Sequence, residues 1–293
     1  MILVTGCTGF LGSAIVKSLL ESGHKVRGLA RHGGPFKDGS ITGIDIVHGS
    51  ILEPETLARA MEGVEKVIHL VGILVETKGQ TFSGVHLQGT KNVLQAAKDA
   101  NVKRYLQMSS MGTRPHATSK YHQSKWLAEE AVRSSGLNIT ILRPSVIFGP
   151  YDEFTTMFAK MARYSPVLPL IGAGENMMQP VWVEDVAQFV NKALNDQQTF
   201  DKTYELGGPE QLTFKTILTE ISKATNKRRA ILPIPLPVLR LQAGLLEKLH
   251  PKPPLTLDQL IMAQEDNVTK QHPWSLYNIN PMHFAEKLRS YIS

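Results

Sequence analysis

The chain has 293 residues with 32 Lys+Arg and 26 Asp+Glu, giving a formal net charge of +6. Its 42% hydrophobic and 20% charged residues are typical of a globular protein and exclude intrinsic disorder. One cysteine excludes a disulfide framework and a cysteine-rich zinc site, and no metal site is expected. Residues 1–4 run directly into glycines, and no stretch approaches the roughly 20 apolar residues of a membrane span. We therefore expect a cytoplasmic protein that is not secreted, with a basic excess that suits an anionic partner.

The first thirty residues predict a strand, a glycine-rich turn, a helix and a second strand. Residues 2–4 are apolar and typical of a strand, residues 5–12 read TGCTGFLG, and Ile15 and Leu19 follow at helical spacing. A second strand is expected over residues 24–31. This order is half of a βαβ dinucleotide-binding unit, whose turn holds a pyrophosphate on backbone amides at a helix N-terminus.

Each glycine of the turn has a predicted task. Gly6 allows the chain to bend, Gly9 allows close approach of the phosphates, and Gly12 allows the helix to pack on the strand. The residues expected to contact the cofactor here are Gly6, Thr8, Gly9, Phe10, Leu11 and Gly12.

The end of the second strand predicts which dinucleotide is bound. Proteins that bind NAD place a carboxylate there, about 20 residues after the turn, for the ribose 2′-hydroxyl. This chain has Ala30 and Arg31 instead, with Arg27 nearby. An arginine can pair with a 2′-phosphate, which favours NADP(H) over NAD(H). The alternative is that Arg31 is an ordinary solvated loop residue.

Strands and helices continue to alternate through residue 150. We expect strands at 45–47, 67–71, 104–108 and 138–142, and helices at 55–61 and 85–97. The predicted fold is α/β, a doubly wound parallel Rossmann sheet with a smaller, mostly helical C-terminal substrate or docking region. The Rossmann domain is assigned to residues 1–150, with core elements returning at about 179–208, and the smaller region to residues 151–178 and 209–293.

The spacing Gly-x-x-Gly-x-x-Gly in TGCTGFLG resembles the short-chain dehydrogenase/reductase superfamily, in its extended and atypical branches. LRPSVIFGP at residues 142–150 is characteristic of the same superfamily. Longer phrases resemble the family of the 39-kDa accessory subunit of respiratory complex I, and they lie at residues 152–174, 179–187 and 255–268. The resemblance implies NADPH binding, with a structural or regulatory nucleotide, and relatives linked to quinone metabolism.

The resemblance also implies a catalytic set. Tyr121 and Lys125 stand at i and i+4, so both project from one helix face. A tyrosine has an unperturbed pKa near 10, and a lysine ammonium beside it is expected to lower that pKa and favour the phenolate. Ser110 is the better match to the family's serine and Ser109 the second. Alternatively, the serines satisfy a turn, and Tyr121 and Lys125 contact the cofactor without turnover.

Further cofactor contacts follow from the resemblance alone. They are Ser50, Ile51, Leu70, Val71, Gly72, Lys125, Pro144, Ser145 and Val146. Two positions depart from the family pattern. Ser50 stands where relatives carry an aspartate for the adenine, and His86 stands where many carry an asparagine of a proton relay.

The second half predicts helices at 152–164 and 209–226, a proline-containing loop at 165–171, a turn at 172–179 and a strand at 203–208. Asp185 is expected to cap a helix. Residues 209–293 carry a net +4, and the basic segment 227–254 contains an amphipathic piece at 238–249. We interpret this segment as a docking surface for a protein or an anionic membrane, or alternatively as a lid helix over the substrate cleft. No nucleic-acid partner is expected.

Three functions remain open from the sequence. The first is an NADP(H)-dependent oxidoreductase acting on a carbonyl or quinone-like substrate through Tyr121, Lys125 and Ser110. The second is a non-catalytic NADPH-binding accessory or assembly protein of a respiratory or quinone-biosynthesis complex. The third is an NAD-dependent sugar-nucleotide epimerase or dehydratase, which the Ala30-Arg31 pair disfavours.

Overall fold

The computed structural model describes residues 1–31 and 41–292. A seven-stranded sheet lies at its centre in the order β11-β6-β5-β4-β1-β2-β3, and every neighbouring pair is parallel. Its strands are β1 (Ile2–Thr5), β2 (Val26–Ala30), β3 (Asp45–His48), β4 (Lys66–His69), β5 (Arg104–Met108), β6 (Ile139–Pro144) and β11 (Lys202–Leu206). The predicted doubly wound Rossmann sheet is thereby confirmed.

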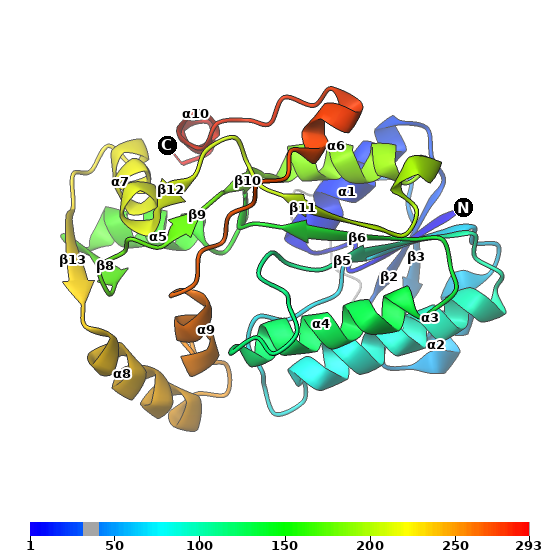
Figure 1. Ribbon diagram of the computed structural model, residues 1–293, viewed down its shortest axis with the longest axis horizontal. Helices are drawn as coiled ribbons and strands as arrows, with labels where there is room; N and C mark the ends of the chain where they lie inside the picture. Colours follow the sequence, from blue (N-terminus) through cyan, green and yellow to red (C-terminus); the bar gives the residue numbers. More distant parts are fainter. Residues whose placement is uncertain (32–40, 293) are drawn as a thin grey trace.

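Helices cover both faces of this sheet (Figure 1). On one face α1 (Phe10–Glu21) packs against α6 (Val183–Ala193), and on the other lie α2 (Pro54–Met61), α3 (Gly89–Asp99) and α4 (Lys120–Arg133). The strand residues alternate between the two faces: Ile2 and Val4 join the core under α1, whereas Leu3 joins the core under α2 and α3. Because both faces are buried, the central strand β1 is fully buried and almost entirely apolar, whereas the edge strands β3 and β11 carry exposed polar residues.

The remaining elements form a smaller region beside the carboxyl ends of the strands (Figure 1). It contains α5 (Thr155–Tyr164), α7 (Phe214–Ala224), α8 (Leu236–Leu249), α9 (Leu257–Met262) and α10 (Phe284–Arg289). Aromatic residues dominate its own core, with Phe148, Phe158, Trp182, Phe214 and Phe284 all buried. After the first part of this region the chain continues through β10 (Val181–Trp182) and α6 to β11 at the edge of the large sheet.

Two predictions for the second half are wrong. Residues 165–171, expected as a loop, contain strand β8 (Val167–Ile171), which pairs in parallel with β13 (Ala230–Ile234). Residues 172–179, expected as a turn, contain β9 (Met177–Met178), which pairs antiparallel with β12 (Leu212–Thr213). Both strands are stabilised by partners distant in sequence, which local patterns do not reveal.

Helix boundaries also differ from the predictions. Asp185 is no cap: α6 begins after Trp182, and the Asp185 carboxylate accepts the Met282 backbone N–H at 2.8 Å. The helix expected at 85–97 is divided into a π-helical turn, Ser83–Gln88, and α3. The helices expected from residues 152 and 209 begin at Thr155 and Phe214. Within the described residues, no helix is long and apolar enough to cross a bilayer.

Candidate functional site

The glycine-rich turn between β1 and α1 has the shape that a pyrophosphate site needs. Gly6 adopts φ +75°, and a Cβ on Gly12 would stand 2.1 Å from the Gly6 carbonyl oxygen. Gly12 thus packs on the turn itself rather than on the strand. Gly9 is the N-cap of α1 and supplies no side chain to bond the first helical amides. These amides and the helix dipole therefore face outward, as binding of an anion requires.

The cysteine within this turn is structural. Cys7 is fully buried, and burial raises the pKa of its thiol to about 11. A Cβ on Gly28 of β2 would stand 2.6 Å from Cys7 Sγ, so this glycine makes room for the thiol. Such a thiol stays protonated and has no role as a nucleophile.

The two arginines near the end of β2 have different surroundings. Arg27 is occupied: it pairs with Asp45 at 2.6 Å and donates to the carbonyl oxygens of Ala60 and Glu62. The Arg31 side chain is exposed, and no ion-pair partner for it occurs among the described residues. Among the described residues, protein groups thus bind the guanidinium of Arg27, and no ion pair forms with that of Arg31.

Ser110 and Tyr121 come together at the end of β5. Tyr121 is 9% exposed, and burial raises the pKa of its phenol while a hydrogen bond with Ser110 opposes that rise. The expected lowering of this pKa by Lys125 is not found, because the shift arises from burial and from the Ser110 hydrogen bond. Ser109 is engaged elsewhere, because its hydroxyl donates to Glu129 at 2.6 Å. The structure thus places Ser110, not Ser109, beside the phenol.

Lys125 lies one helical turn beyond Tyr121 on α4. Its amine donates to the Met108 carbonyl oxygen at 3.3 Å and lies 5.9 Å from the centre of the Tyr121 ring. A Cβ on Gly72 would stand 3.0 Å from this amine, so the missing side chain of Gly72 makes room for it. Burial lowers the pKa of Lys125 to about 8, and Glu129 opposes the shift. The amine is therefore charged at neutral pH.

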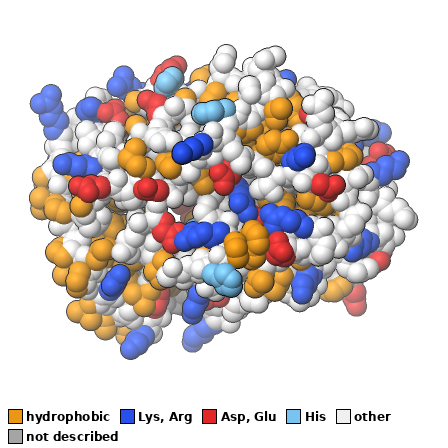
Figure 2. Space-filling view, in the orientation of Figure 1, with side chains coloured by type: hydrophobic (Ala, Val, Ile, Leu, Met, Phe, Trp, Pro, Cys, Tyr) orange, Lys and Arg blue, Asp and Glu red, His pale blue; other side chains and the backbone are white. Residues whose placement is uncertain are grey.

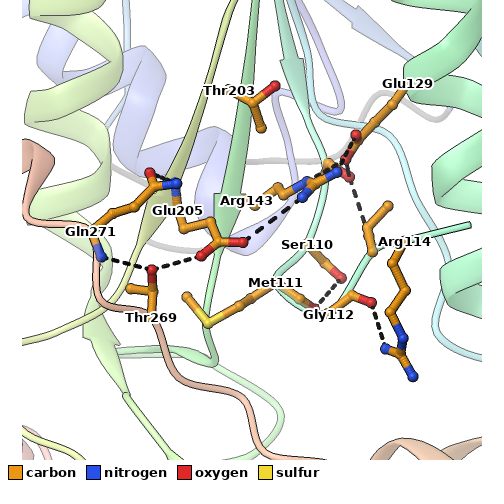
Figure 3. A network of polar contacts seen from close by, with 12 residues as sticks. Ser110, Met111, Gly112, Arg114, Glu129, Arg143, Thr203, Glu205, Thr269 and Gln271 are labelled. Atoms are coloured by element: carbon orange, nitrogen blue, oxygen red, sulfur yellow. Dashed lines mark hydrogen bonds and ion pairs between the residues drawn. The ribbon is translucent and has the colours of Figure 1, made fainter. Parts of the chain in front are cut away.

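Glu129 continues the same face of α4 and anchors a network (Figure 3). Its carboxylate is fully buried and accepts bonds from Ser109, Arg133 and Arg143 at 2.6–2.8 Å. Arg143 approaches Glu205 at 3.8 Å, and Glu205 accepts the Thr269 hydroxyl at 2.6 Å. Glu129 was not predicted. Its spacing from Tyr121 and Lys125, at i, i+4 and i+8, places all three on one helix face and could have indicated it.

His86 stands where many members of the resembled family carry an asparagine, and its ring bonds two separate segments. Its Nε2 accepts the Ile73 N–H at 3.0 Å, so Nδ1 carries the proton and donates to Ser124 Oγ at 2.8 Å. The Ser124 hydroxyl donates in turn to the Tyr121 carbonyl oxygen at 2.7 Å. Burial, with the nearby Lys125 charge, lowers the pKa of His86 to about 2. The neutral His86 ring links the loop after β4 to α4. The π-helical turn that contains His86 positions the ring between these two segments.

The other predicted contacts lie just after β3 and β4. The Ser50 hydroxyl accepts the Leu52 N–H at 3.2 Å. Ile51 is buried against Gly89, and a Cβ at Gly89 would collide with the Ile51 side chain. Leu70 and Val71 follow β4, and a Cβ on Gly6 would contact both residues.

After β6, most backbone polar groups are already paired. Pro144 has no amide, and the Ser145 amide donates to the Leu206 carbonyl oxygen at 3.0 Å. The Ser145 hydroxyl donates to the Asn267 carbonyl oxygen at 3.0 Å. This leaves the Val146 amide as the donor of this segment without a partner among the described residues.

A segment of the smaller region contacts the N-terminus of α4. Asp258 of α9 places its carboxylate at the N-terminus of α4, accepting the Ser119 hydroxyl at 2.9 Å and the Lys120 amide at 2.7 Å. The Tyr121 amide donates to the same carboxylate at 3.1 Å. Further along, Glu265 forms a bidentate pair with Arg114 at 2.8 Å. Neither Asp258 nor Glu265 was predicted, because no local pattern indicates a contact with residues that lie more than 130 positions earlier.

Family comparison agrees with this geometry. Residues 2–207 match the model of the NAD dependent epimerase/dehydratase family. The chain belongs to this family. Its members bind a nicotinamide dinucleotide, and the glycine turn described above fits that ligand.

Two similar proteins have names that indicate different functions. The chain is 28% identical over 290 residues to the mitochondrial NADH dehydrogenase [ubiquinone] 1 alpha subcomplex subunit 9 of Arabidopsis thaliana, covering 97% of this chain and 72% of that protein. It is 32% identical over 187 residues to a ceramide reductase of Caulobacter vibrioides, covering 64% of this chain and 58% of the reductase. The resemblance to the complex I subunit is confirmed.

Solved structures of the family share the fold. The UDP-glucose 4-epimerase of Thermus thermophilus, in complex with NAD, matches with a TM-score of 0.78 at 20% identity over 99% of this chain and 97% of that one. A dTDP-glucose 4,6-dehydratase of Streptomyces venezuelae gives a TM-score of 0.78 at 21% identity, over 99% and 95%. At this identity the likeness is one of fold.

Proposed function

We propose that the protein is an NADP(H)-dependent reductase of a carbonyl or quinone-like substrate. The observation that carries the proposal is the triad of Ser110, Tyr121 and Lys125 at the carboxyl end of β5, with Gly72 making room for the lysine amine. The relative named as a ceramide reductase supports reduction as the direction. The dinucleotide supplies the hydride when bound.

Each side chain then has a defined task. Burial raises the pKa of Tyr121, so the phenol keeps its proton at neutral pH and is suited to donate it to the oxygen of a carbonyl being reduced. Ser110 orients the phenol and bonds the same oxygen. Lys125 is charged below a pKa of about 8 and stabilises the phenolate left behind. Glu129 favours the charged lysine, because its carboxylate opposes the lowering of that pKa.

Variants of Tyr121 test the reaction. With NADPH and a panel of carbonyls and soluble quinones, we expect Tyr121→Phe to lower kcat by about 10²–10⁴-fold while NADPH affinity stays unchanged. Tyr164→Phe, at a residue that is 81% exposed on α5, is the matched control and should retain full activity. Full turnover by Tyr121→Phe would contradict the mechanism.

The preference for NADP(H) rests on Arg31. We expect NADPH to bind more tightly than NADH, and Arg31→Asp to lower NADPH affinity at least about tenfold with little effect on NADH, because the guanidinium–phosphate pair is lost. Calorimetric titration with both dinucleotides measures this, with Arg289→Asp as control. Equal affinities in the wild type would favour the sugar-nucleotide epimerase or dehydratase instead.

A non-catalytic NADPH-binding accessory protein is the second candidate. It is favoured by the match to a complex I subunit over 97% of the chain and by the 9% exposure of Tyr121. This function predicts tight NADPH binding with no NADPH oxidation across the substrate panel. It also predicts that Tyr121→Phe changes neither the bound nucleotide nor assembly with a partner.

A further inference from the structure

Helix α8 is apolar on two opposite faces. On the inner face Leu239 and Ala243 are buried against Leu260 of α9. On the outer face four aliphatic side chains remain in water: Val238 is 55% exposed, Leu241 69%, Leu245 52% and Leu249 81%. A helix at the surface of a globular protein normally presents polar residues outward, so the outer face of α8 lacks the expected polarity.

The exposed residues form one line along the helix. Their spacing of three, four and four places them in a stripe roughly 80° wide, at about 100° per residue. Lys248 lies beside Leu245 and Leu249 at the edge of this stripe. Figure 2 shows hydrophobic side chains gathered at the lower left of the molecule, where Figure 1 places α8, with lysine and arginine side chains among them.

The segment that carries α8 also holds most of the net charge. Residues 227–254 contain six basic residues and one acidic residue, a net +5 of the chain's +6. Arg229 donates to the carbonyl oxygens of Ala162 and Arg163. The other five basic residues are exposed, and they are Lys227, Arg228, Arg240, Lys248 and Lys252.

We propose that α8 binds the surface of a bilayer containing anionic phospholipids, lying flat with its leucine stripe among the acyl chains. Leucines flanked by lysines and arginines are the composition of an interfacial helix, whose long basic side chains reach the headgroups. The position of α8 at the edge of the molecule allows a flat surface to reach it (Figure 1).

Other occupants fit the outer face less well. A second copy docked on the same face would bring two segments of net +5 together, which is repulsive. A protein interface is rich in aromatic residues at its centre, whereas the stripe contains only valine and leucine. An anionic bilayer accepts both the aliphatic stripe and the positive charge.

Vesicle flotation tests the proposal on the full chain. We expect binding to phosphatidylcholine vesicles with about 30 mol% phosphatidylserine, weak binding to phosphatidylcholine alone, and release by salt. Leu241→Ser/Leu249→Ser should lower the partition coefficient at least about tenfold, because the buried apolar surface is lost. The matched control Leu276→Ser/Tyr164→Ser replaces exposed residues of 46% and 81% elsewhere and should bind like the wild type.

Charge reversal separates the electrostatic part. Lys248→Glu/Lys252→Glu should lower binding at least about tenfold, since each basic residue near an anionic surface contributes about fivefold. Lys91→Glu/Lys98→Glu, at exposed residues of α3, gives the same change in net charge away from α8. Equal loss in both pairs would overturn the proposal, because net charge rather than α8 would then govern binding.

A probe at the stripe provides a local readout. Cys7 is buried, so a thiol introduced by Leu245→Cys is labelled selectively with an environment-sensitive dye. A blue shift on anionic vesicles, absent with phosphatidylcholine alone, supports insertion of the stripe. Three results would overturn the proposal: no shift on the anionic vesicles, a wild-type dimer by light scattering that Leu241→Ser/Leu249→Ser converts to monomer, or a stripe protected only by an acidic protein partner.

Discussion

Lys125 carries a positive charge where burial opposes it, and two oxygen-bearing groups compensate. The Met108 carbonyl oxygen accepts its proton, and the Glu129 carboxylate one turn away opposes the fall of its pKa, which settles at about 8. The fold therefore tolerates an unfavourable charge at the point where the proposed reaction requires it. A buried charge that lowers stability is expected at a site where the proposed activity needs that charge.

Replacing this lysine should raise stability. We expect Lys125→Met to increase the free energy of unfolding by about 1–3 kcal/mol at pH 7, because a buried charge is removed while Glu129 keeps Arg133 and Arg143. Above a pH of about 8 the folded wild type releases the lysine proton, whereas the unfolded chain holds it up to about pH 10.5. Wild-type stability should therefore rise with pH in that window.

Urea unfolding of both proteins between pH 6 and pH 11 measures this difference. The advantage of Lys125→Met should be constant below about pH 8 and shrink toward zero by about pH 10.5. A wild type more stable than Lys125→Met at pH 7 would contradict the account. Lys91→Met, at an exposed residue of α3, is the control and should change stability little.

At the level of single residues, the sequence predicts groups that act through their own helix. Tyr121 and Lys125 follow from their spacing, and Ser110 from its place after a strand. Glu129 shares their helix face, yet its role depends on Arg143 from β6 and the Ser109 hydroxyl. Likewise, burial raises the pKa of Tyr121 and the Ser110 hydrogen bond lowers it, and this balance depends on packing that no spacing encodes.

Among the elements, α4 has two capping groups at its N-terminus, one local and one from the smaller region. Ser119 provides the local N-cap by accepting the His122 amide at 3.3 Å, and Asp258 of α9 adds a carboxylate against the positive end of the helix. A charge at this end stabilises a helix and fixes the backbone of its first turn. Tyr121 belongs to that turn.

Removing the distant cap should affect the site more than the fold. We expect Asp258→Ala to cost about 0.5–2 kcal/mol of stability and to lower kcat of the proposed reductase, because the Tyr121 amide loses its partner. Thr213→Ala removes the cap of α7, whose hydroxyl accepts the Thr216 amide at 3.0 Å, and is the matched control. Equal activity of the two variants, at equal loss of stability, would show that Asp258 does not position Tyr121.

The predictability of elements follows the same division. Strands β1, β2 and β5 and helices α1, α2 and α8 were predicted because apolar periodicity and glycines mark them locally. Strand β8 was not, because Pro169 reads as loop chemistry and its partner β13 lies about sixty residues later. The division of residues 83–99 into a π-helical turn and α3 was not predicted either. A π-helical turn holds about one more residue than an α-helical turn, which leaves the apolar pattern nearly unchanged.

Over the whole molecule, the Glu129 network joins the two parts of the structure. It runs from α4 through Arg143 of β6 and Glu205 of β11 to Thr269 beyond α9 (Figure 3). Its central carboxylate has no access to water, so each partner is needed to compensate its burial.

Breaking the centre of this network should be costly. We expect Glu129→Gln to lower the free energy of unfolding by about 3–5 kcal/mol, because the largely buried Arg143 keeps only the more distant Glu205 carboxylate at 3.8 Å. Glu129→Gln/Arg143→Met should recover part of that loss. Chemical denaturation of the wild type and both variants gives the two values, and a double variant less stable than Glu129→Gln alone would contradict the account.

The contribution of Asp258 to α4 has a consequence for the order of events during synthesis. The glycine turn, α1 and the parallel strands through β6 leave the ribosome more than a hundred residues before α9 does. At roughly 5–20 residues per second, several seconds separate the two. The glycine turn and α4 with its local Ser119 cap are therefore synthesised before Asp258 is. The Tyr121 amide gains its carboxylate partner only as translation finishes.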